Sequence, residues 1–169
     1  MAKSKLVGLT FEAWNDVDRV VDGLTPDDAV KQWDEGSSFA WTLAHVTNQV
    51  DIWINVRFQK RTPHPLLGQQ RFRFGGSGAA EEWDAIQEAV QEVREAARTY
   101  LDGMVDEELT VVVPFDGAFT ILRETGLSLQ YALSRVSAHH YFHIGEIAAK
   151  RDRLGHQVGD YPGILEECI

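Results

Sequence analysis

Apolar residues recur every three to four positions through four long stretches of this 169-residue chain. These stretches are residues 6–23, 39–60, 79–102 and 128–154. This spacing aligns apolar side chains along one face of a helix and leaves polar residues on the other. Four such helices joined by short connections are typical of an up-down bundle. We therefore predict an all-α fold.

The segments between the four stretches contain the residues that usually end helices. Pro26 follows Thr25 and starts a short helical turn that we expect to end before Gly36. Ser37 or Ser38 is placed to cap the second long helix, and residues 61–78 carry prolines and glycines without a stable period, which indicates a loop.

A β-branched run precedes the last helix and favours a small β-hairpin. We expect strands at residues 110–115 and 118–122, joined at Asp116 and Gly117. Pro114 cannot donate to a strand partner, so its strand is expected at an edge. The predicted fold class is an up-down four-helix bundle with a short β-hairpin insert before the last helix, forming one domain over residues 1–169, with no internal repeat.

Charge and composition exclude several classes of function. The chain has 16 Lys and Arg against 26 Asp and Glu, a formal charge of −10, which argues against a nucleic-acid partner. No apolar run reaches the ~18–20 residues that span a bilayer, so no membrane partner is expected. The single Cys168 excludes an intramolecular disulfide, and the start of the chain lacks an apolar signal core. We expect a cytoplasmic protein.

Two histidines of the last helix, His139 and His143, are spaced to share one metal ion. Residues four apart leave a helix on the same face. His45 lies in the second helix beside its apolar stripe and is the candidate third ligand. Three imidazoles leave an open coordination position, as in catalytic sites, and suit zinc, nickel or iron. The alternative is three unrelated surface or core histidines.

Glu146 and Arg135 share the helical face of the histidine pair and are the candidate catalytic residues. Glu146 can orient a ligand, act as a general base or bind the metal itself. Its alternative role is a bundle carboxylate paired with Lys150. Arg135 can receive an anionic substrate, and its alternative role is a salt bridge, for example to Asp51 or Glu146.

Two motifs together resemble the DinB/YfiT-like superfamily of metal-binding four-helix bundles. They are Trp41–Val46, which contains His45, and His139–Ile147, which reads His-x-x-x-His-x-Gly-Glu-Ile. The resemblance covers nearly the whole chain and implies a three-histidine divalent metal site at His45, His139 and His143. It also implies that a homodimer is common. Members often carry Arg and Gln where this chain has Ile144 and Glu146.

The resemblance also implies candidate activities. Known members include S-transferases that use a low-molecular-weight thiol, and this is the function we favour for a metal-dependent enzyme acting on a small-molecule substrate. A metal-dependent hydrolase that uses water as the nucleophile is the first alternative. The second is a stress-related metal-binding bundle without enzymatic activity. A di-metal carboxylate bundle is excluded, because no histidine has a glutamate three residues before it.

Overall fold

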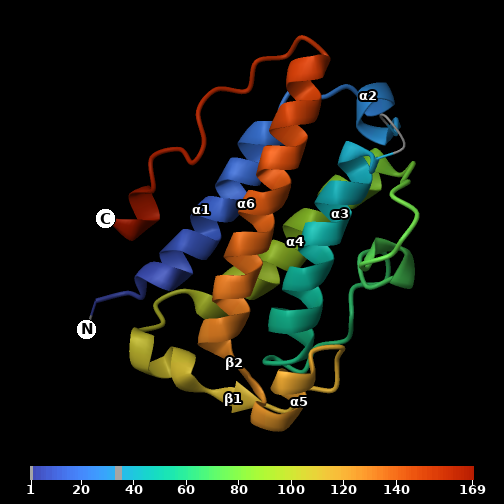
Figure 1. Ribbon diagram of the computed structural model, residues 1–169. Coiled ribbons are helices and arrows are strands. Elements are labelled where there is room, and N and C mark those ends of the chain that lie inside the picture. Colours follow the sequence, from blue (N-terminus) through green and yellow to red (C-terminus); the bar gives the residue numbers. More distant parts are fainter. Residues whose placement is uncertain (1, 33–35) are drawn as a thin grey trace.

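The computed structural model describes residues 2–32 and 36–169, which fold around a bundle of four long helices (Figure 1). The long helices are α1 (Lys5–Val21), α3 (Phe39–Val50), α4 (Trp83–Leu101) and α6 (Leu129–Arg153). Two short helices, α2 (Pro26–Val30) and α5 (Thr120–Thr125), lie in the connections. A π-helical turn, Asp51–Val56, extends α3, and 3-10 turns occupy Gln70–Phe72, Asp106–Thr110 and Glu166–Cys168. The prediction of an all-α bundle is confirmed.

The helices begin where the sequence supplies a capping side chain. Ser4 caps α1 by accepting from the Leu6 amide, and Ser38 caps α3 by accepting from the Trp41 amide. Ser128 caps α6 in the same way, so the last helix begins one residue later than expected. The α4 helix starts at Trp83 rather than near residue 79, because residues 79–82 have no regular secondary structure and the Gly78 carbonyl accepts from the Ser38 amide.

The order of helix directions departs once from an up-down alternation, because α3 and α4 run parallel. The Gly78 carbonyl lies at the start of α3, whereas further along the chain Asn55 donates to the Val93 carbonyl at 3.0 Å. Residues 57–82 therefore return along the length of the bundle (Figure 1). Two residues of this return segment, Leu67 and Phe72, are fully buried, so it packs on the bundle beside α3.

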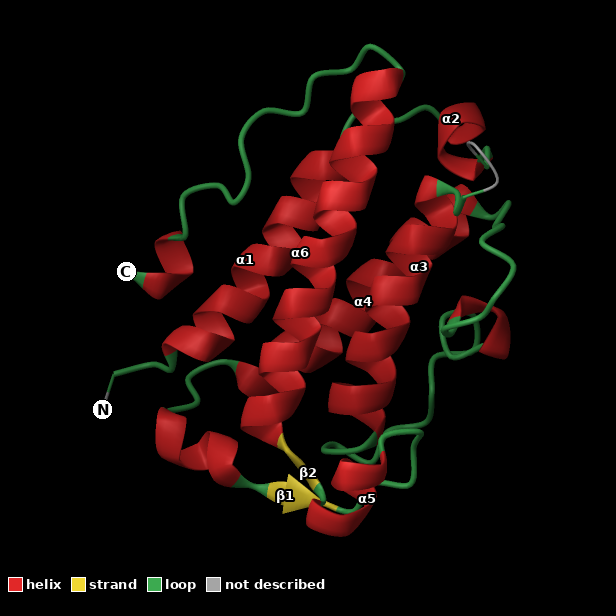
Figure 2. Ribbon diagram, in the orientation of Figure 1, coloured by secondary structure: helices red, strands yellow, loops and turns green. Residues whose placement is uncertain are grey.

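The predicted hairpin is correct in its place and wrong in its second strand. The strands are β1 (Val112–Val113) and β2 (Leu127–Ser128), which pair antiparallel at one end of the bundle (Figure 2). The second strand was expected at residues 118–122, but residues 120–125 form α5. Pro114 ends the ladder after two residues, and Gly126, with φ of 80°, turns the chain from α5 into β2.

Packing of α6 against two neighbours determines where its polar side chains lie. In Figure 1, α6 (orange) lies between α1 and α3, with α4 behind. Apolar residues of α6 such as Leu133, Val136 and Ile147 are buried in the shared core. The face of α6 that meets α3 is more polar, and it carries the histidine pair. No helix of the described residues is long and apolar enough to cross a membrane.

Candidate metal centre

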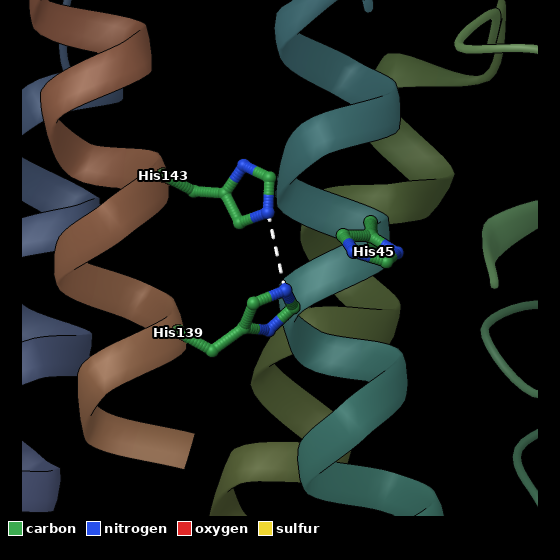
Figure 3. A group of neighbouring side chains, drawn as sticks. All are labelled: His45, His139 and His143. Atoms are coloured by element: carbon green, nitrogen blue, oxygen red, sulfur yellow. Dashed lines mark hydrogen bonds between the residues drawn. The ribbon is translucent and has the colours of Figure 1, made fainter. Parts of the chain in front are cut away.

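Three histidines from two helices converge between α3 and α6. His45 lies in the middle of α3, and His139 and His143 lie one turn apart on α6 (Figure 3). One ring nitrogen from each residue lies within 4.8 Å of the other two. The structure therefore brings together the three residues that the sequence predicts as ligands and forms a possible metal site.

The α6 pair has the spacing of two ligands of one ion. The Nε2 atoms of His139 and His143 are 3.1 Å apart (Figure 3). Two nitrogens bound to zinc at about 2.0–2.1 Å, with an angle of about 90–110° between them, lie about 2.8–3.4 Å apart. The 3.1 Å separation thus fits shared coordination by the two Nε2 atoms.

Residues 70–72 hold the His45 ring from the outside. The Nδ1 atom of His45 donates to the Phe72 carbonyl at 2.6 Å, which leaves Nε2 as the free nitrogen. The ring also stacks on Trp41, with 4.6 Å between centroids and 11° between planes. Trp41 in turn donates from Nε1 to the Arg71 carbonyl at 2.8 Å. The return segment therefore fixes the orientation of His45.

Glu146 holds the His143 ring. The Nδ1 atom of His143 donates to Oε2 of Glu146 at 2.7 Å, so Nε2 of His143 is its free nitrogen. The other oxygen of Glu146, Oε1, accepts from Ser37 Oγ at 2.7 Å and from the Lys150 ammonium. Burial raises the pKa of this carboxyl, but hydrogen bonds from its three partners outweigh burial and lower the pKa to about 2. Glu146 is therefore a carboxylate at neutral pH.

The surroundings of His139 and His45 favour the neutral form of their rings. Burial, followed by the neighbouring histidines and Arg135, lowers the pKa of His139 to about 3. Burial also lowers the pKa of His45. Both rings are thus neutral at physiological pH, which is the form that binds metals. The Nδ1 atom of His139 is buried without a hydrogen-bond partner among the described residues.

The donor set and its surroundings fit a divalent transition-metal ion. Each of the three residues offers an imidazole nitrogen, which suits zinc, nickel or iron. Two of the three rings have their second nitrogen held by an acceptor, a carbonyl for His45 and a carboxylate for His143, as is usual around bound metals. His45, His139 and His143 would hold the ion.

Arg135 lies beside the site and outside the ion-pair network of Glu146. It is exposed, and its guanidinium carbon is 5.1 Å from the Phe119 ring centre. None of the ion pairs among residues 2–32 and 36–169 includes Arg135, so the expected salt bridge is not formed. Asp51, one expected partner, accepts instead from the His64 amide at 2.7 Å.

The other histidines that the structure describes in the helical core and return segment do not join the site. His140 is fully buried, and its Nδ1 donates to the Val136 carbonyl at 2.8 Å. His64 accepts from the Leu66 and Leu67 amides through Nδ1 and lies near Glu92. Both histidines therefore bind other parts of the chain and lie outside the histidine cluster.

Two contributors to the site, Ser37 and the Phe72 carbonyl, had no signal in the sequence. Each reaches the histidines or Glu146 from an irregular segment, and one of the two acts through its backbone. Trp41 did have a signal, because it lies one helical turn before His45, where its ring is placed to form part of the wall of the site.

Comparisons with known proteins identify the family and support the fold. A family model described as the DinB superfamily matches residues 10–147, a range that includes all three histidines and Glu146. A solved structure, a conserved protein from Enterococcus faecalis, has a TM-score of 0.69 at 14% identity, with 92% of this chain and 100% of that chain covered. That likeness concerns the fold. No curated protein gives a significant match.

Proposed function

The chain belongs to the DinB superfamily, and we propose that it is a metal-dependent S-transferase that uses a low-molecular-weight thiol. The observation that carries the proposal is the convergence of three imidazoles, two of them held by hydrogen bonds from Nδ1 to the Phe72 carbonyl and to Glu146. A divalent ion at such a site lowers the pKa of a thiol or water and polarises an electrophile. Three protein ligands leave a position for a substrate.

The state of Glu146 favours a thiol over water as the nucleophile. Its two oxygens accept hydrogen bonds from His143, Ser37 and Lys150, and its pKa is lowered to about 2, so it is a weak general base. A thiol with a pKa of about 8.5 ionises near neutral pH with little help. Water, with a pKa of about 15.7, depends far more on its activation.

The nucleophile must come from a second substrate. Cys168, the single cysteine, lies against the start of α1, where its Sγ is 3.6 Å from the Lys5 carbonyl. Burial is the main factor that raises the pKa of its thiol, which makes it less reactive at neutral pH. In the proposed reaction the sulfur of the free thiol bonds to the electrophilic substrate, the leaving group departs with the bonding pair, and the thiol proton passes to solvent.

The test is an activity assay on protein loaded with zinc, nickel or iron. A panel of cellular thiols is combined with a chromogenic electrophile, and the rate is compared with that of free metal and thiol. We expect a rate above this background that is lost in His45→Ala and kept in His156→Ala, an exposed histidine outside the site. Equal activity in His45→Ala would contradict the proposal.

Two other outcomes favour the alternatives. Turnover of esters or amides without thiol would identify a hydrolase. One bound metal ion per chain without turnover of either substrate class would identify a non-enzymatic metal-binding bundle.

A further inference from the structure

A pocket opens on the exposed side of α6, directly beside the histidines. Its volume is about 310 Å³, and Arg135, Ala138, His139 and Phe142 line it. These residues follow one another along one face of the helix, at positions three, four and seven apart. Because His139 belongs both to the pocket and to the candidate metal centre, a ligand in the pocket lies next to that centre.

The charge at the mouth of this pocket is positive. Glu146, the carboxylate nearest the histidines, is paired with Lys150, so their charges balance. Arg135 has no carboxylate partner among the described residues, and its guanidinium contacts the Phe119 ring instead. In a protein with a net charge of −10, an unpaired arginine beside a pocket is a local exception. It provides donors suited to a carboxylate.

Two exposed aromatic rings lie near this cation. Phe142 is 72% exposed, and its ring meets the His143 ring edge-on at 5.0 Å between centroids. Phe119 is 39% exposed and contacts the Arg135 guanidinium. Apolar side chains that are exposed together beside a pocket are a feature of ligand-binding surfaces. A cation with two exposed rings near it matches a molecule that combines an anionic group with an apolar body.

We propose that this pocket binds the carboxylate of an apolar or aromatic acid, with Arg135 as the carboxylate-binding residue and Phe119 and Phe142 against the apolar body. The proposal rests on the proposed function, because it identifies the electrophilic substrate of the S-transferase as an organic acid. It adds a specificity residue to a site whose histidines alone do not select a substrate.

The test measures binding without metal, so that a carboxylate cannot be held by the ion. Benzoate and its neutral analogue benzamide are titrated into EDTA-treated protein and followed by NMR. We expect benzoate to bind at least about tenfold more tightly than benzamide, and Arg135→Gln to remove this difference. Arg135→Lys, which keeps the charge without the planar fork, should retain part of it. Phe142→Ala should weaken both probes.

The matched control is Arg123→Gln, which removes an exposed arginine of α5 whose described hydrogen bond is to Thr120. It should bind benzoate as the wild type does. Equal benzoate affinity in Arg135→Gln and wild type, or equal affinity for benzoate and benzamide, would overturn the proposal. Zinc titration of the same proteins tests the metal centre separately: Arg135→Gln should bind zinc like the wild type. Failure of zinc binding in the wild type would contradict the proposed function and leave the benzoate result interpretable.

Discussion

His139 and His140 are neighbours in the sequence and lie in opposite environments of α6. The step of about 100° per residue turns His139 toward α3 and the pocket and His140 into the core. There His140 is fully buried, with Nε2 lacking a hydrogen-bond partner among the described residues. Burial, and after it the guanidinium of Arg94, lowers the pKa of His140 well below 6.5. In the part of the chain that the structure describes, His140 belongs to no group of three or more histidine, cysteine or carboxylate side chains that could hold a metal ion.

The difference shows what separates a candidate ligand from a core histidine. Burial is the main factor that lowers the pKa of both residues, so a lowered pKa does not distinguish them. The neighbours of each ring do distinguish them. His139 lies close to His143 and His45, whereas His140 forms a hydrogen bond with the backbone of its own helix. Around the cluster, Phe72 and Glu146 also hold the rings from behind. The following substitutions test this contrast.

The largest expected effect is on metal affinity when a clustered histidine is removed. His139→Ala should weaken zinc binding by more than about 100-fold, since loss of a ligand exceeds the 10–100-fold typical for an outer partner. His140→Ala is the adjacent control and should bind zinc within a few-fold of the wild type. Zinc affinity is measured by competition with a chromophoric chelator at pH 7.5. Similar losses in both variants would show that the two faces of α6 are not distinct.

Removal of Glu146 should have the next largest effect. Glu146→Ala leaves His143 Nδ1 without its acceptor and Lys150 without its carboxylate partner, so we expect zinc affinity to fall about 10–100-fold. Glu146→Gln keeps an acceptor oxygen and removes the charge, so its loss should be smaller. The same chelator competition measures both. If Glu146→Gln lowers the zinc affinity as much as Glu146→Ala does, the charge of Glu146 matters for zinc binding and its hydrogen bond to His143 does not.

Removal of the buried histidine, His140, should lower the free energy of unfolding and leave metal binding largely unchanged. His140→Ala removes a fully buried ring and leaves a cavity, which should lower the free energy of unfolding by about 2 kcal/mol or more. Urea denaturation in EDTA measures the change. His139→Ala, from a half-buried position at the pocket, should lower it less. A larger loss for His139→Ala would reverse the assignment of the two faces.

Much of this arrangement was predictable from the sequence, because it depends on helical periodicity. The expected ranges 6–23 and 128–154 differ from α1 and α6 by only one or two residues at each end. The His139 and His143 pair followed from the four-residue spacing, and His45 from its position in a second helix together with the family resemblance. These features depend on one helix, or on two helices that must pack through their apolar stripes.

The remaining features depend on contacts that the sequence does not encode locally. Apolar composition in residues 118–122 favoured a strand, but the pairing partner of β1 is β2, which is placed by Gly126 and the short ladder. The return of residues 57–82 along the bundle, and hence the contact of the Phe72 carbonyl with His45, follows from tertiary packing of Leu67 and Phe72. Backbone acceptors carry no residue-type signal.

Lowering the pH should destabilise the metal-free fold through the histidines on both faces of α6. The pKa of His139 is lowered from 6.5 to about 3, and those of His140 and His45 are also lowered, so below pH 6.5 the unfolded chain binds more protons than the folded one. Stability is therefore retained above pH 6.5 and falls at lower pH, by up to about 1.4 kcal/mol per pH unit for each histidine. Urea denaturation in EDTA between pH 7.5 and pH 5 measures the slope.

The slope should become shallower in His139→Ala, which removes one of these groups. Glu146, whose pKa is lowered to about 2, contributes its stability above the usual carboxyl pKa of 4.5 and loses it only at lower pH, so it does not act in this window. A free energy of unfolding that stays constant from pH 7.5 to pH 5 would be inconsistent with buried neutral histidines.

The smallest expected effect concerns Ser37, whose hydroxyl contacts both Glu146 and Lys150. Its Oγ donates to Glu146 Oε1 at 2.7 Å, and Lys150 contacts the same oxygen. Ser37→Ala removes one of three hydrogen bonds to the carboxylate, so zinc affinity should fall less than tenfold, about 1 kcal/mol or less. Ser134→Ala is the matched control, because its hydroxyl bonds to the Gln130 carbonyl of its own helix. A loss of zinc affinity in Ser37→Ala as large as that in Glu146→Ala would show that Ser37, and not Lys150, determines where the carboxylate lies. The network that supports the histidines would then extend from α6 to the segment before α3.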